Sequence, residues 1–466
     1  MSAVSVTAPA PAGRRSEWVR DPARVLAALL VAAIMLAGGV TVFRFHIFAE
    51  VDERAHLAYV QEVAEHGRLP VMDHSYVSWQ ELALEAHTYP RHSSLNPRLI
   101  GLRGDSYEAW QPPLYYVLAA PAFLIPSNYR DKVLAVRAFD LLLLALAVAT
   151  LILLAKAVFG ERWPAPCCLA LSTVLWPGVI VRVITVSNAA LELPMALLYV
   201  LVVWNATARP RRRSLVAAGG LLGLCALTQL TLVCLAPLLA FPIAAHLRGR
   251  RERSDPADRG ATGAVALTIA LPIIIVAPWL VSNESRYRAL TASSLVERLT
   301  EAYESEVHRS GLVAVSSRLW RLDRAALPLE WWQEYRGVLG VLLIALPVVI
   351  VLIAAVPVVR DPRLLRSRAA GILAAPLALG LATLIAIVLL EEWPAALFPR
   401  YVNPMLPPFA LFAAWAWLAL RARGRSLLAL AAGSSLVVVV TWVYMAGAYY
   451  FTHVGATLGI HAAPIR

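Results

Sequence analysis

Two adjacent carboxylates and a histidine follow the first long apolar run of the chain, in the sequence Asp52-Glu53-Arg54-Ala55-His56. If the apolar run spans a membrane, these side chains lie where the chain leaves it. An acidic side chain at a membrane–water boundary can serve as a general base beside a lipid substrate. Asp52 can also cap a helix, since a carboxylate at a helix N-terminus accepts hydrogen bonds from free N–H groups. The local sequence supports both interpretations.

The same stretch offers a second kind of chemistry. Asp52 and His56 are one helical turn apart, so a helix places them on one face. Together with Glu53, or with another histidine on the same side of the membrane, they could bind a divalent cation. A metal site needs more ligands than this spacing supplies. The cation is therefore an alternative to the general base, and the identity of any cofactor stays open.

The composition identifies the class of protein. Of the 466 residues, 59% are hydrophobic and only 15% are charged, and the mean hydropathy is +0.64. Soluble domains carry about 25% charged residues, so the chain is predicted to be a polytopic membrane protein. The net charge of +12 does not indicate nucleic-acid binding, because the basic residues form short clusters between apolar runs, as cytoplasmic loops do. The cysteines lie inside apolar runs and indicate neither disulfides nor a zinc site.

The elements that position the acidic pair are predicted from apolar length and from loop charge. Basic clusters such as 209–213 and 248–259 are assigned to the cytoplasm, which fixes the side of every other loop. The result is an all-α fold with about eleven transmembrane helices. The predicted spans are 24–43, 133–156, 164–181, 189–208, 214–228, 231–247, 261–282, 337–359, 369–390, 404–421 and 426–446.

This topology divides the chain into a transmembrane domain, 23–446, between a disordered cytoplasmic tail, 1–22, and a short extracytoplasmic tail, 447–466. Two large extracytoplasmic loops are expected, at 45–132 and 283–336. The first contains a helix that begins at Asp52 and stops at Gly67, and a later apolar element. That element, 113–126, is too short to cross the bilayer and starts and ends outside, so it is predicted to be juxtamembrane or re-entrant.

Polar side chains near the span ends fall mostly on the outer side. Ionisable groups at membrane depth are costly and tend to mark functional cavities; the alternative is that outer loops are simply polar and that arginine reaches back to the interface. We expect an outward-facing polar cavity. Tyr115 and Tyr116 would line it or form part of an interfacial aromatic belt. Its other polar candidates are Arg137, Asp140, Arg182, Asn188, Glu192, Gln229, Glu391, Glu392, Arg400 and Tyr401.

Several short motifs, in order along the chain, resemble those of the GT-C glycosyltransferases. The motifs are Asp52-Glu53-x-x-His56, Gly67-Arg68-Leu69-Pro70, Glu108-x-x-Gln111-Pro112-Pro113-Leu114-Tyr115-Tyr116, Pro278-Trp279-x-x-x-Asn283 and Arg400-Tyr401-x-x-Pro404-x-x-Pro407. The resemblance is to bacterial polyprenyl-phosphate-sugar-dependent enzymes related to protein O-mannosyltransferases and to the aminoarabinose transferase of lipid A. It implies a GT-C-like fold, a catalytic acidic residue in the first outer loop and inverting transfer from a lipid-phosphate-linked sugar.

Mapped onto this chain, the resemblance makes Asp52 the general base and Glu53 a support, a metal contact or an alternative base. Arg400 would contact the donor phosphate. Two positions depart from the pattern: relatives have a lysine where this chain has Gln229, and Asn-Asp where it has Asn188-Ala189. The candidate substrate-binding residues are His56, Gln111, Tyr115, Tyr116, Arg137, Arg182, Asn188, Gln229, Arg400 and Tyr401.

The sequence therefore predicts a glycosyltransferase of the bacterial plasma membrane, with its active site on the extracytoplasmic face. Its partners would be the bilayer, a polyprenyl-phosphate-linked sugar and an acceptor that is a protein, a polysaccharide or a lipid. A transporter or flippase of lipid-linked sugars is one alternative, but it would need polar groups along a path through the whole bilayer. A non-catalytic relative in a membrane assembly is the other alternative.

Overall fold

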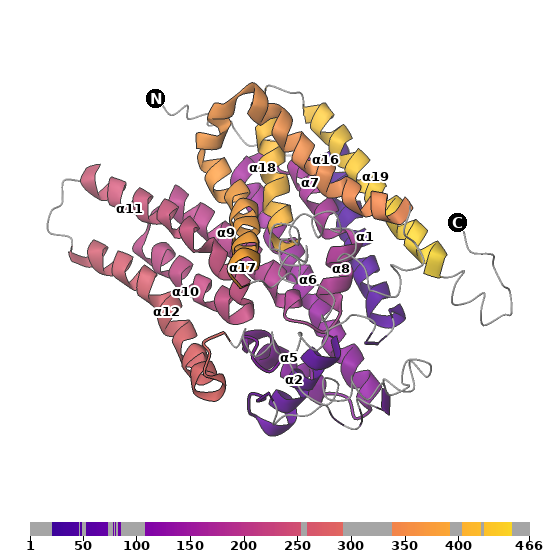
Figure 1. The fold of residues 1–466 in the computed structure, drawn as a ribbon. Coiled ribbons are helices and arrows are strands. Elements are labelled where there is room, and N and C mark those ends of the chain that lie inside the picture. Colours follow the sequence, from indigo (N-terminus) through magenta and orange to yellow (C-terminus); the bar gives the residue numbers. More distant parts are fainter. Residues whose placement is uncertain are drawn as a thin grey trace, which may run out of the picture.

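The fold is known from a computed structural model, and every element in its described residues is helical (Figure 1). The described residues are 21–45, 47–48, 53–72, 78, 80, 83–84, 108–252, 259–291, 338–391, 403–420 and 424–449. The all-α prediction is confirmed for this part of the chain. Asp52, Arg400 and Tyr401, all predicted site residues, lie outside it, as does the polar candidate Glu392. Most of the predicted second outer loop and most of each predicted tail also lie outside it.

Long apolar helices identify an integral membrane protein. Among the described residues, 6 helices are long and apolar enough to cross a bilayer, or up to 7 if one bent pair counts as a single span. They are Pro22–Arg44, Tyr129–Arg162, Ala189–Ala208, Leu230–Gly249, Thr262–Tyr287 and Gly424–Val443. A helix also lies in each of the other segments predicted to span, including 17-residue α10 (Arg212–Thr228), α16 (Val338–Arg360), α17 (Ala375–Glu391) and α18 (Leu406–Ala419). The total of about eleven crossings stays a prediction.

The first span, α1 (Pro22–Arg44), begins and ends where local chemistry requires. Asp21 caps it by accepting a hydrogen bond from the N–H of Ala23 at 3.0 Å, and Pro22 occupies the first turn, where its missing N–H costs nothing. One side of the helix is packed, with Ile34 fully buried, whereas Leu36 is 70% exposed. An exposed apolar face on such a helix is the face that lipid covers.

The predicted span 164–181 differs from a straight helix. It consists of α7 (Pro164–Val174) and α8 (Pro177–Ile184), which are bent by 65° at the break between them. Pro177 causes the bend, because proline lacks the N–H that would continue the helix and forces the preceding Trp176 out of the helical region. Trp176 accordingly has a ψ of 131°. The bend directs the end of α8, with Arg182, toward the start of α9 (Ala189–Ala208).

Helix α10 packs closely on α12 (Arg259–Tyr287) through two glycines. A Cβ at Gly219 would lie 2.2 Å from the carbonyl oxygen of Thr268, and one at Gly223 would lie 2.9 Å from the Cβ of Ile275. Glycine four positions apart lets two helix backbones approach within a membrane, where van der Waals packing drives association. The Gly-x-x-x-Gly spacing is the sequence signal for this helix pair.

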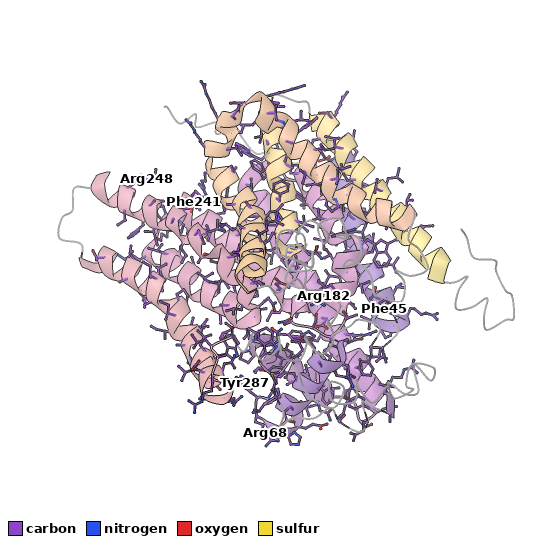
Figure 2. The ribbon with its side chains drawn as sticks, in the orientation of Figure 1. Phe45, Arg68, Arg182, Phe241, Arg248 and Tyr287 are labelled. Atoms are coloured by element: carbon purple, nitrogen blue, oxygen red, sulfur yellow. The ribbon has the colours of Figure 1, made fainter. Side chains whose placement is uncertain are left out.

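The predicted outer elements gather at one end of the helical bundle. Helix α2 (Glu53–His66) and the 11-residue helix α5 (Leu114–Leu124) pack together there, below the long helices in Figure 1. In Figure 2, Arg68 and Tyr287 lie at this lower end, whereas Arg248 of α11 (Ala240–Glu252) lies at the opposite, upper end. The helix predicted from Asp52 to Gly67 is confirmed from Glu53 onward, and Gly67 ends it with a φ of +64°, which glycine adopts without strain.

Candidate functional site

A buried ion pair holds the acidic residue Glu53 at the start of α2. Arg137 of α6 (Tyr129–Phe159) donates from Nε and Nη2 to the two carboxylate oxygens of Glu53, both at 2.7 Å. Neither side chain has any exposed surface. This bidentate geometry is the strongest arrangement of an arginine and a carboxylate. Because the pair is buried, removing either side chain would leave the charge of the other uncompensated.

Arg137 also fixes the chain between the first span and α2. Its Nη1 donates to the carbonyl oxygens of Phe45 at 2.8 Å and of Val42 at 3.5 Å. Glu53 accepts further hydrogen bonds from the backbone N–H of Phe48 at 2.7 Å and of Val186 at 3.3 Å. Phe48 has a φ of 64°, a conformation that a bulky residue adopts only when its surroundings impose it.

We call these two side chains, Glu53 and Arg137, the clamp. The clamp joins the end of α1 and the start of α2 to two segments that are distant in sequence, α6 and the turn before α9. Because the Arg137 guanidinium is enclosed by protein groups, its contacts favour a positioning role over the direct substrate contact predicted from the sequence. The same holds for Glu53, whose two oxygens are already occupied, so among the predicted roles the contacts favour that of a support.

A second polar pair continues from the clamp along α6. The hydroxyl of Tyr115 on α5 donates to the Asp140 carboxylate at 2.9 and 3.2 Å. Both residues are fully buried, and Asp140 lies three residues beyond Arg137 on α6. This hydrogen bond attaches the short helix α5 to a spanning helix, so the predicted juxtamembrane element has a fixed position.

Three aromatic side chains of α2 and α5 form a stack beside the clamp. The rings of Tyr59 and Tyr116 are parallel, with centroids 3.7 Å apart, and the Tyr116 hydroxyl lies 2.7 Å from Nδ1 of His56. Tyr59 in turn donates to the carbonyl oxygen of Gln111 at 3.3 Å. Burial first, and then the neighbouring Tyr287, raise the pKa of Tyr59 far above its ordinary value, so its hydroxyl stays a hydrogen-bond donor at neutral pH. Tyr59 was not predicted from the sequence; its place three residues after His56 is the only signal.

Three amide side chains from distant segments meet in what we call the amide cluster, formed by Gln111, Asn188 and Gln229. Nδ2 of Asn188 donates to Oε1 of Gln111 at 3.2 Å and to Oε1 of Gln229. It also lies 3.3 Å from the carbonyl oxygen of Thr228, and Gln111 donates to Glu108 at 2.8 Å. The cluster members are 3% to 8% exposed. The structure thus brings together three of the predicted binding residues, among them Gln229, which departs from the sequence pattern, and Asn188, which directly precedes the second departing position, Ala189.

The end of α12 is attached to the same region. Nδ2 of Asn283 donates to the carbonyl oxygen of Trp110 at 3.3 Å, and the hydroxyl of Tyr287 accepts from the N–H of Met72 at 3.2 Å. Asn283, the last residue of one sequence motif, is 2% exposed. It therefore holds the segment before Gln111 in place. Arg182, another predicted binding residue, is half-buried in the last turn of α8 and is labelled in Figure 2.

Two of the three predicted metal ligands, Glu53 and His56, lie within the described residues. Among the described residues, no three histidine, cysteine or acidic side chains are grouped so that they could hold a metal ion. Glu53 is engaged by Arg137, and His56 by Tyr116. Asp52, the third predicted ligand, is not described. A cation at this position would thus have to take Glu53 and His56 away from their present partners.

Comparison with solved structures gives matches of low sequence identity. The chain is 16% identical to the oligosaccharyltransferase of Archaeoglobus fulgidus in complex with zinc and sulfate, covering 87% of this chain and 53% of that one with a TM-score of 0.45. It is 14% identical to ArnT from Cupriavidus metallidurans, in the apo state (89% and 78% covered, TM-score 0.38) and bound to undecaprenyl phosphate (91% and 78%, TM-score 0.37).

The chain thus spans about half the length of the oligosaccharyltransferase that it matches. No protein-family model matches the sequence, and a search of curated proteins finds no match either.

Proposed function

We propose that this protein is a membrane glycosyltransferase that moves a sugar from a polyprenyl-phosphate donor to an extracytoplasmic acceptor. The observation that carries the proposal is the clamp. An arginine with no exposed surface ties the carboxylate of Glu53 to the end of the first span, so Glu53, the residue after Asp52, begins a helix that is held in place. Fixing the backbone beside a reacting group is how enzymes obtain proximity and orientation.

In this proposal Asp52, the residue before Glu53, is the general base. It accepts the proton of the acceptor hydroxyl while that oxygen attacks the anomeric carbon of the sugar. The bond between that carbon and the phosphate oxygen breaks, its electron pair leaves with the phosphate, and the configuration at the carbon inverts. The saturation of both Glu53 oxygens by Arg137 and two backbone N–H groups is the reason to prefer Asp52.

The negative charge that builds on the departing phosphate needs a cation. Arg400 is the proposed contact, because a planar guanidinium matches two phosphate oxygens; Tyr401 would accompany it, and Arg182 is the candidate within the described residues. A divalent cation held by Asp52, Glu53 and His56 is the alternative. It would act as a Lewis acid on the phosphate, but it has to compete with the clamp for Glu53.

The sugar itself is proposed to lie against the amide cluster and the aromatic stack. Amide groups both donate and accept hydrogen bonds, which suits the hydroxyl groups of a neutral sugar. The side-chain oxygen of Gln229 accepts from Asn188, and its amide N–H groups are the proposed donors to the sugar. Tyr116 and His56 would form the aromatic side of the site.

The test is Asp52→Asn in the purified full-length protein, assayed with synthetic polyprenyl-phosphate sugars and extracytoplasmic acceptor fractions. Transfer is expected to fall by at least about a hundredfold, since general-base catalysis contributes 10²–10⁴-fold, while the unfolding temperature stays unchanged. Glu65→Gln, which changes an exposed acidic residue of α2, the helix that follows Asp52 in the sequence, is the matched control. Near-normal turnover by Asp52→Asn would contradict the assignment. Donor binding without transfer by the wild type, over a panel of acceptors, would instead indicate a non-catalytic relative.

A further inference from the structure

A groove at the surface between α16, α17 and α18 lies far from the candidate site. Its volume is about 540 Å³, and every residue that lines it is apolar. Small side chains make the hollow, among them Ala354, Ala355, Ala374 and Ala378, and Phe409 and Phe412 of α18 complete its wall.

A local change of helix type gives the groove a rigid back. The five residues Ala370–Ala374 form a π-helical turn before α17, and Gly371 of this turn is packed against Phe241 of α11. A Cβ at Gly371 would lie 2.1 Å from Cζ of Phe241. Wide turns of this kind interrupt helices at functional positions more often than elsewhere. The groove is therefore backed by tight packing, while its open side faces the surrounding lipid.

The groove covers one leaflet of the bilayer. Its lining runs along the π-helical turn and the start of α17, from Ala370 to Leu381, a rise of about 16 Å at 1.5 Å per residue. This is roughly half of the 30 Å hydrocarbon core. One end is formed by Leu365 of the short helix η4 (Pro362–Arg366), so the groove belongs to the leaflet next to the basic loops. Figure 1 shows that the α16–α17 turn lies at the opposite end of the molecule from α2 and α5.

Positive charge surrounds this end of the groove. Arg363 and Arg366 flank Leu365 on η4, Arg360 precedes them, and all three arginines are exposed. The single acidic neighbour, Asp361, accepts the backbone N–H of Arg363 at 3.1 Å as the cap of η4. Arg368 does not contribute, because its guanidinium is turned toward Trp204, 4.2 Å from the centre of that ring.

We propose that the groove holds an acyl chain of an anionic phospholipid from the leaflet next to the basic loops, with the lipid phosphate on Arg363 and Arg366. Charge complementarity argues for this occupant, since basic pockets between helices on the cytoplasmic side attract anionic headgroups. The donor lipid is a poorer fit, because its phosphate must reach the acidic pair at the other end of the protein. The proposal does not depend on the proposed transferase activity.

The test measures lipid binding to the purified full-length protein by native mass spectrometry and by the shift in unfolding temperature. Phosphatidylglycerol is expected to bind saturably and to raise the unfolding temperature, since a ligand that binds only the folded state stabilises it. Phosphatidylcholine, with the same chains and no net charge, is expected to bind at least about tenfold more weakly, because each basic residue near the headgroup contributes about 1 kcal/mol.

Two variants separate the headgroup from the chain. Replacing both Arg363 and Arg366 by Gln is expected to weaken phosphatidylglycerol binding by about thirtyfold, the equivalent of two such contributions. Ala378→Trp fills the groove from its exposed side and is expected to abolish saturable binding. Val359→Trp is the matched control, because Val359 is 79% exposed on α16 and does not line the groove.

Equal binding of the two phospholipids would overturn the proposal and indicate ordinary lipid at the protein surface. Tighter binding of a polyprenyl phosphate that Ala378→Trp removes would overturn it in favour of the donor tail. Unchanged phosphatidylglycerol binding by folded Ala378→Trp would show that the groove is not the site. Because all of these measurements are of binding, an inactive protein would give the same answers.

Discussion

Removal of Arg137 is the most direct test of the clamp. Arg137→Met keeps much of the length and apolar volume of the side chain and deletes its charge and its donors. The Glu53 carboxylate then stays at the same fully buried position with only the N–H groups of Phe48 and Val186 as partners. A buried charge without its counter-ion is among the costliest defects in a folded protein.

The contacts give the size of the effect. Two hydrogen bonds of 2.7 Å to Glu53 and one of 2.8 Å to Phe45 are lost, and Glu53 is left without compensation. Breaking a buried ion pair from one side costs about 3–5 kcal/mol. Arg137→Lys is expected to fall between the wild type and Arg137→Met, because an ammonium group retains the charge but cannot form the two parallel bonds.

The assay is a double-mutant cycle with Glu53→Leu, measured as the free energy of unfolding in mixed detergent. Removing both partners leaves no buried charge, so the double variant is expected to recover most of the stability that Arg137→Met loses. The coupling energy should exceed about 1 kcal/mol, as it does for residues in one network. An unfolding free energy of Arg137→Met within about 0.5 kcal/mol of the wild type, the range typical of surface substitutions, would refute the argument.

Three further predictions follow from single contacts. Gly219→Ala is expected to destabilise the protein by about 1–3 kcal/mol through overpacking. Gly220→Ala should be tolerated, because its Cβ would lie 3.9 Å from Cδ1 of Leu271, an ordinary van der Waals distance; the free energy of unfolding measures both. Burial raises the pKa of Glu65, but hydrogen bonds from Gln61 and Lys132 and the Lys132 charge outweigh it, and the net pKa is below the ordinary 4.5. The stabilisation by Glu65 is therefore complete above about pH 4.5 and is lost below it, so the stability gap between the wild type and Glu65→Gln should close between pH 7 and pH 3. Gln229→Leu leaves Asn188 its hydrogen bonds to Gln111 and Thr228, so the free energy of unfolding should change by only about 1 kcal/mol. The KM for the sugar donor is expected to rise. An unchanged KM would exclude Gln229 from the sugar site.

The helices could be predicted from the sequence because their signals are local. Apolar length gave the long helices, and Gly67 marked the end of α2. The signal for the bend at Pro177 is equally local, since a proline inside an apolar run interrupts the helical hydrogen bonds. The span 164–181 was predicted from apolar length and loop charge, and neither of these shows the bend. The Gly219 and Gly223 spacing is another local signal, and it specifies a helix pair rather than a helix.

The contacts within the site could not be predicted in the same way. Glu53 and Arg137 are separated by 84 positions, and no pattern within a helix says which residue on another helix will face it. Loop charge and the predicted topology placed the polar residues at one end of the molecule, but they did not show which of these side chains contact each other. Gln229 illustrates the limit: in the sequence it is only a missing lysine, whereas in the structure it accepts the Asn188 amide beside Gln111.

The clamp also raises the question of why a buried ion pair is present at all. Well-packed apolar residues in place of such a pair are often neutral or stabilising, so stability alone does not require Glu53 and Arg137. The pair does provide direction: a guanidinium fork with carbonyl contacts on one side and a carboxylate on the other accepts only one arrangement of α1, α2 and α6. We therefore expect Glu53→Leu combined with Arg137→Met to fold and yet to lose transfer, because the start of α2 is no longer held in a single position. A double variant that is both stable and fully active would show that the clamp serves only folding.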